Sequence, residues 1–154
     1  SWGACATEIK VNEETGEIRV LRIAQCFDAG TVINPMICEG QTEGGACMGL
    51  GSALYEELVM EDGIALNPNF VDYRLPTFME MPTKEMKAMI ADPVPLPGGP
   101  FGAKGFCEGG LIPMTPAISN ALFDALGIRI NSIPITREKV LKALEEKKSK
   151  VTVA

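Results

Sequence analysis

The stretch from residue 92 to residue 100, Asp-Pro-Val-Pro-Leu-Pro-Gly-Gly-Pro, limits the possible folds of this chain more than any other feature. Each proline lacks a backbone N–H, and it also disfavours the helical conformation at the residue before it. Neither a helix nor a paired strand is therefore expected to run through this stretch. We expect a rigid loop that continues through Phe101 to Gly110.

Patterns typical of β-strands precede this loop. Residues 4–11 and 17–26 are rich in apolar residues that partly alternate with polar ones, and the Asn-Glu-Glu-Thr-Gly segment between them supplies a turn. The pattern predicts a β-hairpin. Further short strands are expected on both sides of the turn at 61–63, at 84–91 and at 129–133.

A helix is expected from Pro35 to Tyr55, because Asn34 is a good N-cap and proline is favoured at the first helical position. Glycine inside a helix lowers its stability by about 1 kcal/mol relative to alanine, yet this segment is rich in it. Its glycines are Gly40, Gly44, Gly45, Gly49 and Gly51. They allow another element or a ligand to approach the backbone closely.

Two further helices are expected after the loop. One covers 113–126 and ends at Gly127, and the other opens at Thr136. Val140, Leu141 and Leu144 form the apolar face of the last helix. With no internal repeat or linker, the sequence predicts one α+β domain over 1–154: a β-hairpin and short strands packed with a glycine-rich helix and C-terminal helices.

Composition excludes several classes of function. The net charge of −6 is unsuited to neutralising phosphates, so neither nucleic acid nor an anionic membrane is an expected partner. No uninterrupted run of about 18 apolar residues predicts a membrane-spanning helix. The absence of histidine rules out a Ser-His-Asp or Cys-His pair, and a histidine-ligated metal, within these 154 residues.

The five cysteines are widely spread, and no two form a C-x-x-C pair. We therefore expect small, mostly buried thiols in a reduced cytoplasmic protein, without a disulfide framework. The N-terminus has neither an initiator methionine nor a signal peptide pattern. We therefore expect the chain to be a fragment of a longer protein.

Two polar residues stand out as candidates for chemistry. Glu108 lies among glycines at the end of the rigid loop, where a catalytic base would be placed; the alternative is a solvated loop glutamate. Gln41 lies among the helix glycines, where its amide could contact a flat heterocycle; the alternative is an ordinary surface glutamine. Asp28 and Asn34 are interpreted as turn and capping residues, and Lys104 either binds an anion or pairs with a carboxylate.

Several blocks of sequence follow one another in a familiar order. They are Asp28-Ala29-Gly30 with Ile33-Asn34-Pro35, Glu39 to Gly45, Met48 to Gly51, Leu66 to Phe70, Asp72 to Pro76, Gly99 to Gly105 with Glu108, and Pro116 to Ile118. Together they resemble the C-terminal portion of the large, molybdenum-cofactor subunit of the xanthine dehydrogenase and aldehyde oxidase family. The resemblance covers nearly the whole chain.

The resemblance implies roles for particular residues. Glu108 matches the family's catalytic glutamate, a general base, and Gln41 matches the glutamine that hydrogen-bonds the pterin dithiolene. Gly44 and Gly45 are expected to let the cofactor approach. Cys107 stands where most relatives have glycine; it is either a harmless small side chain or a thiol that adjusts the surroundings of the metal. No residue of this chain is expected to ligate the molybdenum, because the dithiolene does so.

The resemblance also implies a function. The chain would be part of a molybdenum hydroxylase that inserts water-derived oxygen at an electron-poor carbon of an N-heterocycle or aldehyde. Electrons would leave through iron–sulfur clusters, with or without FAD, on other domains or subunits. The preceding half of the molybdopterin-binding region would complete the pocket, so the isolated fragment or split subunit would be inactive. The alternative is a non-catalytic domain of the same fold that binds a cofactor or a partner.

Overall fold

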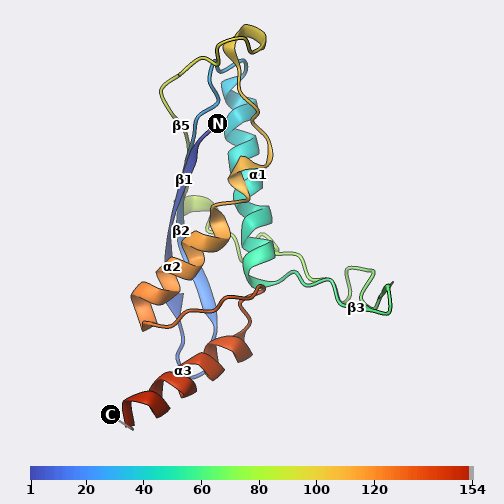
Figure 1. Ribbon diagram of the computed structural model, residues 1–154, viewed down its shortest axis with the longest axis vertical. Helices are drawn as coiled ribbons and strands as arrows, with labels where there is room; N and C mark the ends of the chain where they lie inside the picture. The colour runs from blue at the N-terminus through green and yellow to red at the C-terminus, as the bar shows by residue number, and fades with distance from the viewer. Residues whose placement is uncertain (153–154) are drawn as a thin grey trace.

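The computed structural model describes residues 1–152, with side chains to residue 149. It is a mixed α/β fold built from short strands and helices (Figure 1). The strands are β1 (Gly3–Val11), β2 (Ile18–Phe27), β3 (Met60–Glu61), β4 (Ile64–Ala65) and β5 (Met86–Ile90). The helices are α1 (Pro35–Leu54), α2 (Met114–Leu126) and α3 (Arg137–Thr152), with short 3₁₀ turns η1 (Thr83–Glu85), η2 (Pro100–Gly102) and η3 (Glu108–Gly110).

The three longer strands form one sheet in the order β1-β2-β5. β1 and β2 pair antiparallel, which confirms the predicted hairpin, and β5 pairs parallel to β2. The hairpin turn is fixed by Asn12, whose Oδ1 accepts hydrogen bonds from the backbone N–H groups of Glu14 and Thr15. Gly16 has a φ of 71°, a conformation that glycine adopts easily.

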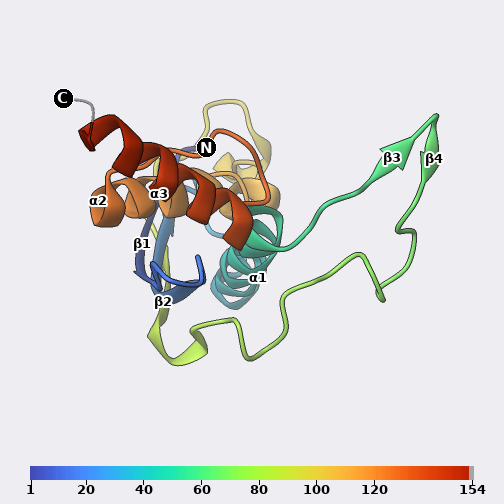
Figure 2. The same cartoon turned by 90° about the horizontal axis from the view of Figure 1, so that it is seen from below.

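One face of the sheet carries the core. α1 and α2 lie side by side on it, with α3 at one end (Figures 1 and 2). β2 buries Ile18 and Val20 on one side of a bulge and Ile23, Gln25 and Phe27 on the other, so these side chains point toward the helices. The fully buried core includes Ile23, Leu50, Met114, Ile118, Leu122 and Val140. Burial of each such side chain stabilises the fold by roughly 1.5–3 kcal/mol.

The ends of the helices follow the capping signals in the sequence. Asn34 caps α1, with its Oδ1 accepting from the backbone N–H of Ile37 at 3.1 Å. Gly127 ends α2 in a left-handed conformation with a φ of 63°. In α3, Val140 and Leu144 are buried as expected, while Leu141 is half-buried.

The prediction of a strand at 129–133 is wrong. No strand forms there, because this segment crosses the end of α1 instead of lying along an edge of the sheet. The backbone N–H of Ile135 donates to the carbonyl of Ala53 at 2.6 Å. The apolar residues Ile128 and Ile135 are buried singly in the core, and the guanidinium of Arg129 stacks over Phe123 at 4.1 Å.

A long segment, residues 57–82, extends away from the body and carries the small β3–β4 hairpin (Figure 2). We call this segment the arm. Asn67 fixes its base, since Oδ1 accepts from the N–H of Val59 at 2.9 Å and Nδ2 donates to the carbonyl of Glu57 at 2.6 Å. Exposed apolar side chains of the arm are Leu58, Val59, Met60, Ile64, Leu66, Phe70, Val71, Leu75, Phe78 and Met79. None of the helices in residues 1–152 is long and apolar enough to cross a membrane.

Candidate functional site

The η3 turn, which begins with Glu108, lies directly against α1. A Cβ added to Gly45 would stand 2.8 Å from the Cα of Gly110, and one added to Gly49 would stand 2.4 Å from the Cβ of Met114. Both distances are shorter than packed carbon atoms tolerate, so these positions require glycine. The two glycines of α1 therefore allow the loop and the start of α2 to contact the helix backbone.

Glu108 is exposed at the first position of η3. Its backbone carbonyl accepts from the N–H of Leu111 at 3.0 Å, which closes the turn. Cys107, immediately before it, is also exposed. Phe106 packs edge-on against Phe27 with ring centroids 6.2 Å apart, and this contact anchors the loop to the sheet. The carboxylate is thus presented to solvent from a turn whose backbone is held on both sides.

The predicted contact residues of α1 fall into two groups. Gln41 and Gly44 are exposed, and a Cβ at Gly40 or Gly44 would meet nothing within 4 Å. Gly45 is instead buried beneath Gly110. Since residues four apart lie on the same helix face, Gln41 is one turn before the point where the loop covers the helix. The open strip of α1 backbone therefore borders the loop that carries Glu108.

A buried ion pair joins the proline-stiffened loop to the end of β2. Lys104 and Asp28 pair with side chains only 13% and 12% exposed, so Lys104 pairs with a carboxylate. The second oxygen of Asp28 accepts from the N–H of Gly30 at 2.8 Å. The pKa of Asp28 is lowered, chiefly because Lys104 donates a hydrogen bond to the carboxylate and also because Gly30 does. Two backbone hydrogen bonds, Lys104 to Ala29 at 3.0 Å and Thr31 to Gly102 at 3.0 Å, strengthen the connection.

Gln25, for which the sequence pattern predicted no role, lies beneath the loop. Its side chain is 1% exposed, and Nε2 donates to the carbonyl of Gly110 at 2.8 Å. The signal present in the sequence was a polar residue at an inward position of an otherwise apolar strand face. The partner could not be identified from local sequence, because it lies 85 residues further along the chain.

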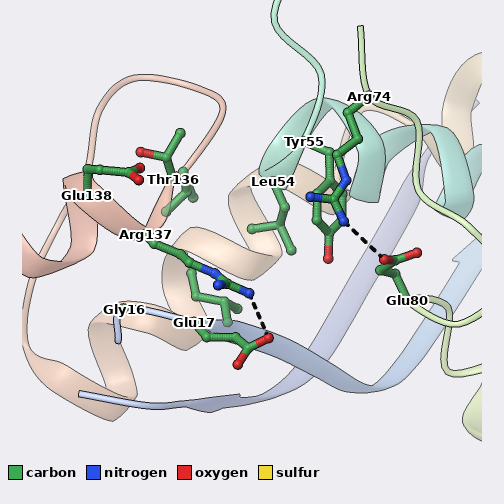
Figure 3. A pocket seen from close by; sticks show the side chains of 11 residues that line it. Gly16, Glu17, Leu54, Tyr55, Arg74, Glu80, Thr136, Arg137 and Glu138 are labelled. Atoms are coloured by element: carbon green, nitrogen blue, oxygen red, sulfur yellow. Dashed lines mark hydrogen bonds and ion pairs between the residues drawn. The ribbon is translucent and has the colours of Figure 1, made fainter. Parts of the chain in front are cut away.

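A separate hollow of about 390 Å³ lies near the other end of α1 (Figure 3). Its two arginines are each neutralised, Arg74 by Glu80 at 3.5 Å and Arg137 by Glu17 at 2.9 Å. Tyr55 lies under Arg74, and its pKa is raised, mainly by burial. This hollow contains none of the residues that the sequence singled out, and its paired charges leave no free cation for an anionic ligand.

Comparison with known proteins identifies the family. Residues 1–82 match the model of the molybdopterin cofactor-binding domain. Because this match covers more than half of the chain, the protein belongs to the molybdopterin cofactor-binding domain family, as the sequence resemblance indicated.

Similar proteins extend this finding to most of the chain. The chain is 39% identical over 142 residues to the 6-hydroxypseudooxynicotine dehydrogenase complex subunit gamma of Paenarthrobacter nicotinovorans, covering 90% of this chain and 18% of that protein. It is 38% identical over 147 residues to a probable xanthine dehydrogenase subunit of Bacillus subtilis, covering 96% of this chain and 19% of that protein. The solved structure of the aldehyde oxidoreductase of Desulfovibrio gigas matches with a TM-score of 0.80 and 34% identity, covering 90% of this chain and 15% of that one. This chain therefore spans less than a fifth of the length of these proteins.

The described residues fit a molybdopterin. The exposed amide of Gln41 can donate and accept hydrogen bonds, and the open backbone at Gly40 and Gly44 leaves room beside it for a flat group. Among residues 1–152, no group of three or more Cys, Asp or Glu side chains is arranged to hold a metal ion.

Proposed function

We propose that this chain is the C-terminal part of the molybdopterin-binding region of a molybdenum hydroxylase. Such an oxidoreductase inserts water-derived oxygen at an electron-poor carbon of an N-heterocycle or aldehyde. The placement of Glu108 carries the proposal: an exposed carboxylate stands on a turn that packs, backbone to backbone, against a helix whose open glycine positions border it. The names of similar proteins, a probable xanthine dehydrogenase and an aldehyde oxidoreductase, support the reaction class.

The residues of this chain have distinct roles in the proposed reaction. When bound, the molybdenum cofactor supplies the redox chemistry by taking up two electrons from the substrate. The Glu108 carboxylate accepts the proton of the water-derived oxygen as that oxygen attacks the electron-poor carbon. The contacts of the η3 turn hold the carboxylate in position, which matters because a displacement of about 1 Å can lower a rate roughly a hundredfold.

We propose that the cofactor contacts come from α1 and from the loop. Gln41 hydrogen-bonds the pterin, and Gly44 leaves the space that it occupies. Gly45 allows the loop that carries Glu108 to pack against α1, and it lies next to the predicted cofactor contacts. Cys107 places an exposed thiol beside the cofactor.

We further propose that the chain works within a larger assembly in a reducing, cytoplasmic environment. The remainder of the molybdopterin-binding region completes the pocket, and iron–sulfur clusters, with or without FAD, on other domains or subunits take the electrons. Two observations support this: the exposed apolar arm offers a surface for a partner, and all five cysteines are unpaired. The isolated chain is expected to be inactive.

The proposal is tested by Glu108→Gln in the complete, molybdenum-loaded enzyme. The amide has nearly the same size as the carboxylate but cannot act as the base. Turnover of an aldehyde or N-heterocycle is expected to fall at least about a hundredfold, with molybdenum content unchanged. Glu14→Gln, an exposed glutamate in the hairpin turn, is the matched control and should retain full turnover.

Near-normal turnover in the Glu108→Gln enzyme would refute the assignment of the base. The chain would then be better described as a non-catalytic domain that binds the cofactor or a partner.

A further inference from the structure

A single glutamine interrupts the apolar inner face of β2. Gln25 is 1% exposed and lies between Ile23, which is 1% exposed, and Phe27, which is 6% exposed. Burial of an amide is unfavourable unless it is hydrogen-bonded. An apolar side chain at this position would complete the core, so the buried glutamine is expected to make a hydrogen bond that an apolar side chain could not.

The hydrogen bonds of Gln25 point to the loop. Nε2 donates to the carbonyl oxygen of Gly110 at 2.8 Å, with the weak acceptors Cys5 Sγ and Met114 Sδ at 3.5 Å and 3.9 Å. The Oε1 atom has no hydrogen-bond partner within the described part of the chain. The one strong hydrogen bond of this buried amide is therefore directed at the last residue of the turn that begins with Glu108.

The turn needs such a constraint. Gly109 and Gly110 have no side chains to anchor them, and within the turn their torsions are constrained by the backbone hydrogen bond from Leu111 to Glu108. Gly110 is held from one side by the backbone of α1, where a Cβ on Gly110 would stand 3.1 Å from the carbonyl of Thr42. Gln25 holds it from the sheet. Together these contacts fix the backbone two residues after the exposed carboxylate.

We propose that Gln25 is a positioning residue: its Nε2–H bond to the Gly110 carbonyl fixes the η3 turn and thereby aims the Glu108 carboxylate at the substrate. This inference rests on the proposed role of Glu108 as the base. It predicts that loss of the hydrogen bond affects the chemical step more than it affects substrate binding.

The first test compares Gln25→Met with Ile23→Val in the complete, molybdenum-loaded enzyme. Methionine fills a similar volume but cannot donate to the carbonyl of Gly110. We expect kcat to fall about tenfold or more, with KM changed less than about twofold. Ile23→Val alters the same buried strand face without touching this hydrogen bond, so it should lower the melting temperature and leave kcat unchanged.

A second readout does not depend on activity. In the metal-free enzyme, Gln25→Met should speed amide hydrogen exchange in a peptide covering 106–113 by about tenfold, because the turn opens more often. A peptide covering 118–126 of α2 should exchange at the wild-type rate. Ile23→Val should leave exchange in the 106–113 peptide at the wild-type rate, because it does not touch the turn.

Gln25→Glu separates positioning from simple support of the fold, even if Gln25→Met folds poorly. Burial is expected to raise the pKa of the new carboxyl, which would donate to the Gly110 carbonyl when protonated and repel it when ionised. The ratio of its kcat to that of wild type should therefore rise as pH falls. Cys5, the titratable group in contact with Gln25 among residues 1–152, adds no titration in this range, because burial raises the pKa of its thiol.

The outcomes distinguish this inference from the proposed function. If Glu108→Gln abolishes turnover but both Gln25 variants keep wild-type kcat, a flat pH ratio and normal exchange in 106–113, the positioning role is overturned and the base stands. If Glu108→Gln retains turnover, the proposed function fails regardless of Gln25. Lower kcat, faster exchange and the pH-dependent ratio together support the inference.

Discussion

At the scale of single residues, the Asp28–Lys104 pair connects the proline-stiffened loop to the sheet. The lowered pKa of Asp28 means that its ionised form is favoured in the folded protein, first through the hydrogen bond from Lys104 and then through the N–H of Gly30. A carboxyl group with a lowered pKa stabilises the fold at pH values above its ordinary pKa. That stability is lost as pH falls through the lowered value of the folded state.

Asp28→Asn should therefore lower the melting temperature of the purified chain at neutral pH. The difference from wild type should shrink as pH falls below the ordinary pKa of aspartate, about 3.9, because the wild-type carboxylate is then protonated as well. Thermal melts across this pH range measure the effect. A difference that stays constant with pH would show that the pair does not act through the charge of Asp28.

At the scale of elements, the glycines of α1 have two different physical reasons. Gly49 is needed for contact with the start of α2, whereas Gly44 faces open space. The first is a packing requirement of the fold. Gly44 has no packing partner in the described structure. A glycine that weakens a helix without allowing closer packing is expected where a ligand approaches the backbone.

Alanine substitution should separate these reasons. Gly49→Ala is expected to lower the free energy of unfolding by about 1–3 kcal/mol, because the new methyl overlaps Met114. Gly44→Ala is expected to raise it by up to about 1 kcal/mol through helix propensity. Denaturant titrations of the purified chain provide the measurement, and destabilisation by Gly44→Ala would argue against an open position. In the complete enzyme, Gly44→Ala should reduce the molybdopterin content. A molybdopterin content equal to that of wild type would contradict a cofactor contact at Gly44.

Elements with strong local signals could be predicted from the sequence. The hairpin follows from alternation around an Asn-containing turn, and the start of α1 and the end of α2 follow from Asn34 and Gly127. The segment 129–133 has strand-like residues, but the chain just after it is tied to the end of α1 by the hydrogen bond from Ile135 to Ala53, which local composition does not reveal. Glu108 and Gln41 could be singled out by their glycine-rich surroundings. Gln25 could not, because its meaning depends on a contact with a distant loop.

At the scale of the whole molecule, the arm stands out because the sheet and helices do not bury its apolar side chains. It extends away from the sheet and helices (Figure 2) and carries a series of exposed apolar side chains. Contiguous exposed apolar surface marks an interaction site more often than a free surface. This geometry supports the proposal that the rest of a larger enzyme covers the arm.

Limited proteolysis tests that proposal. In the purified chain, a protease of broad specificity should cut first in the outer part of the arm, around β3 and β4, because these strands pair with each other and extend away from the sheet and helices (Figure 2). In the complete enzyme the same segment should be protected. The loop at 98–105, held by Lys104 and its backbone hydrogen bonds, should resist cleavage in both samples. Equal cleavage of the arm in both samples would contradict a covered arm.

The central claim is that this chain contributes to a working molybdenum site. It is tested most directly by measuring molybdenum per copy of this chain in the native complex, isolated with an antibody against the chain. We expect a stoichiometric amount of molybdenum. A native complex without molybdenum, from cells that load other molybdoenzymes, would contradict the claim.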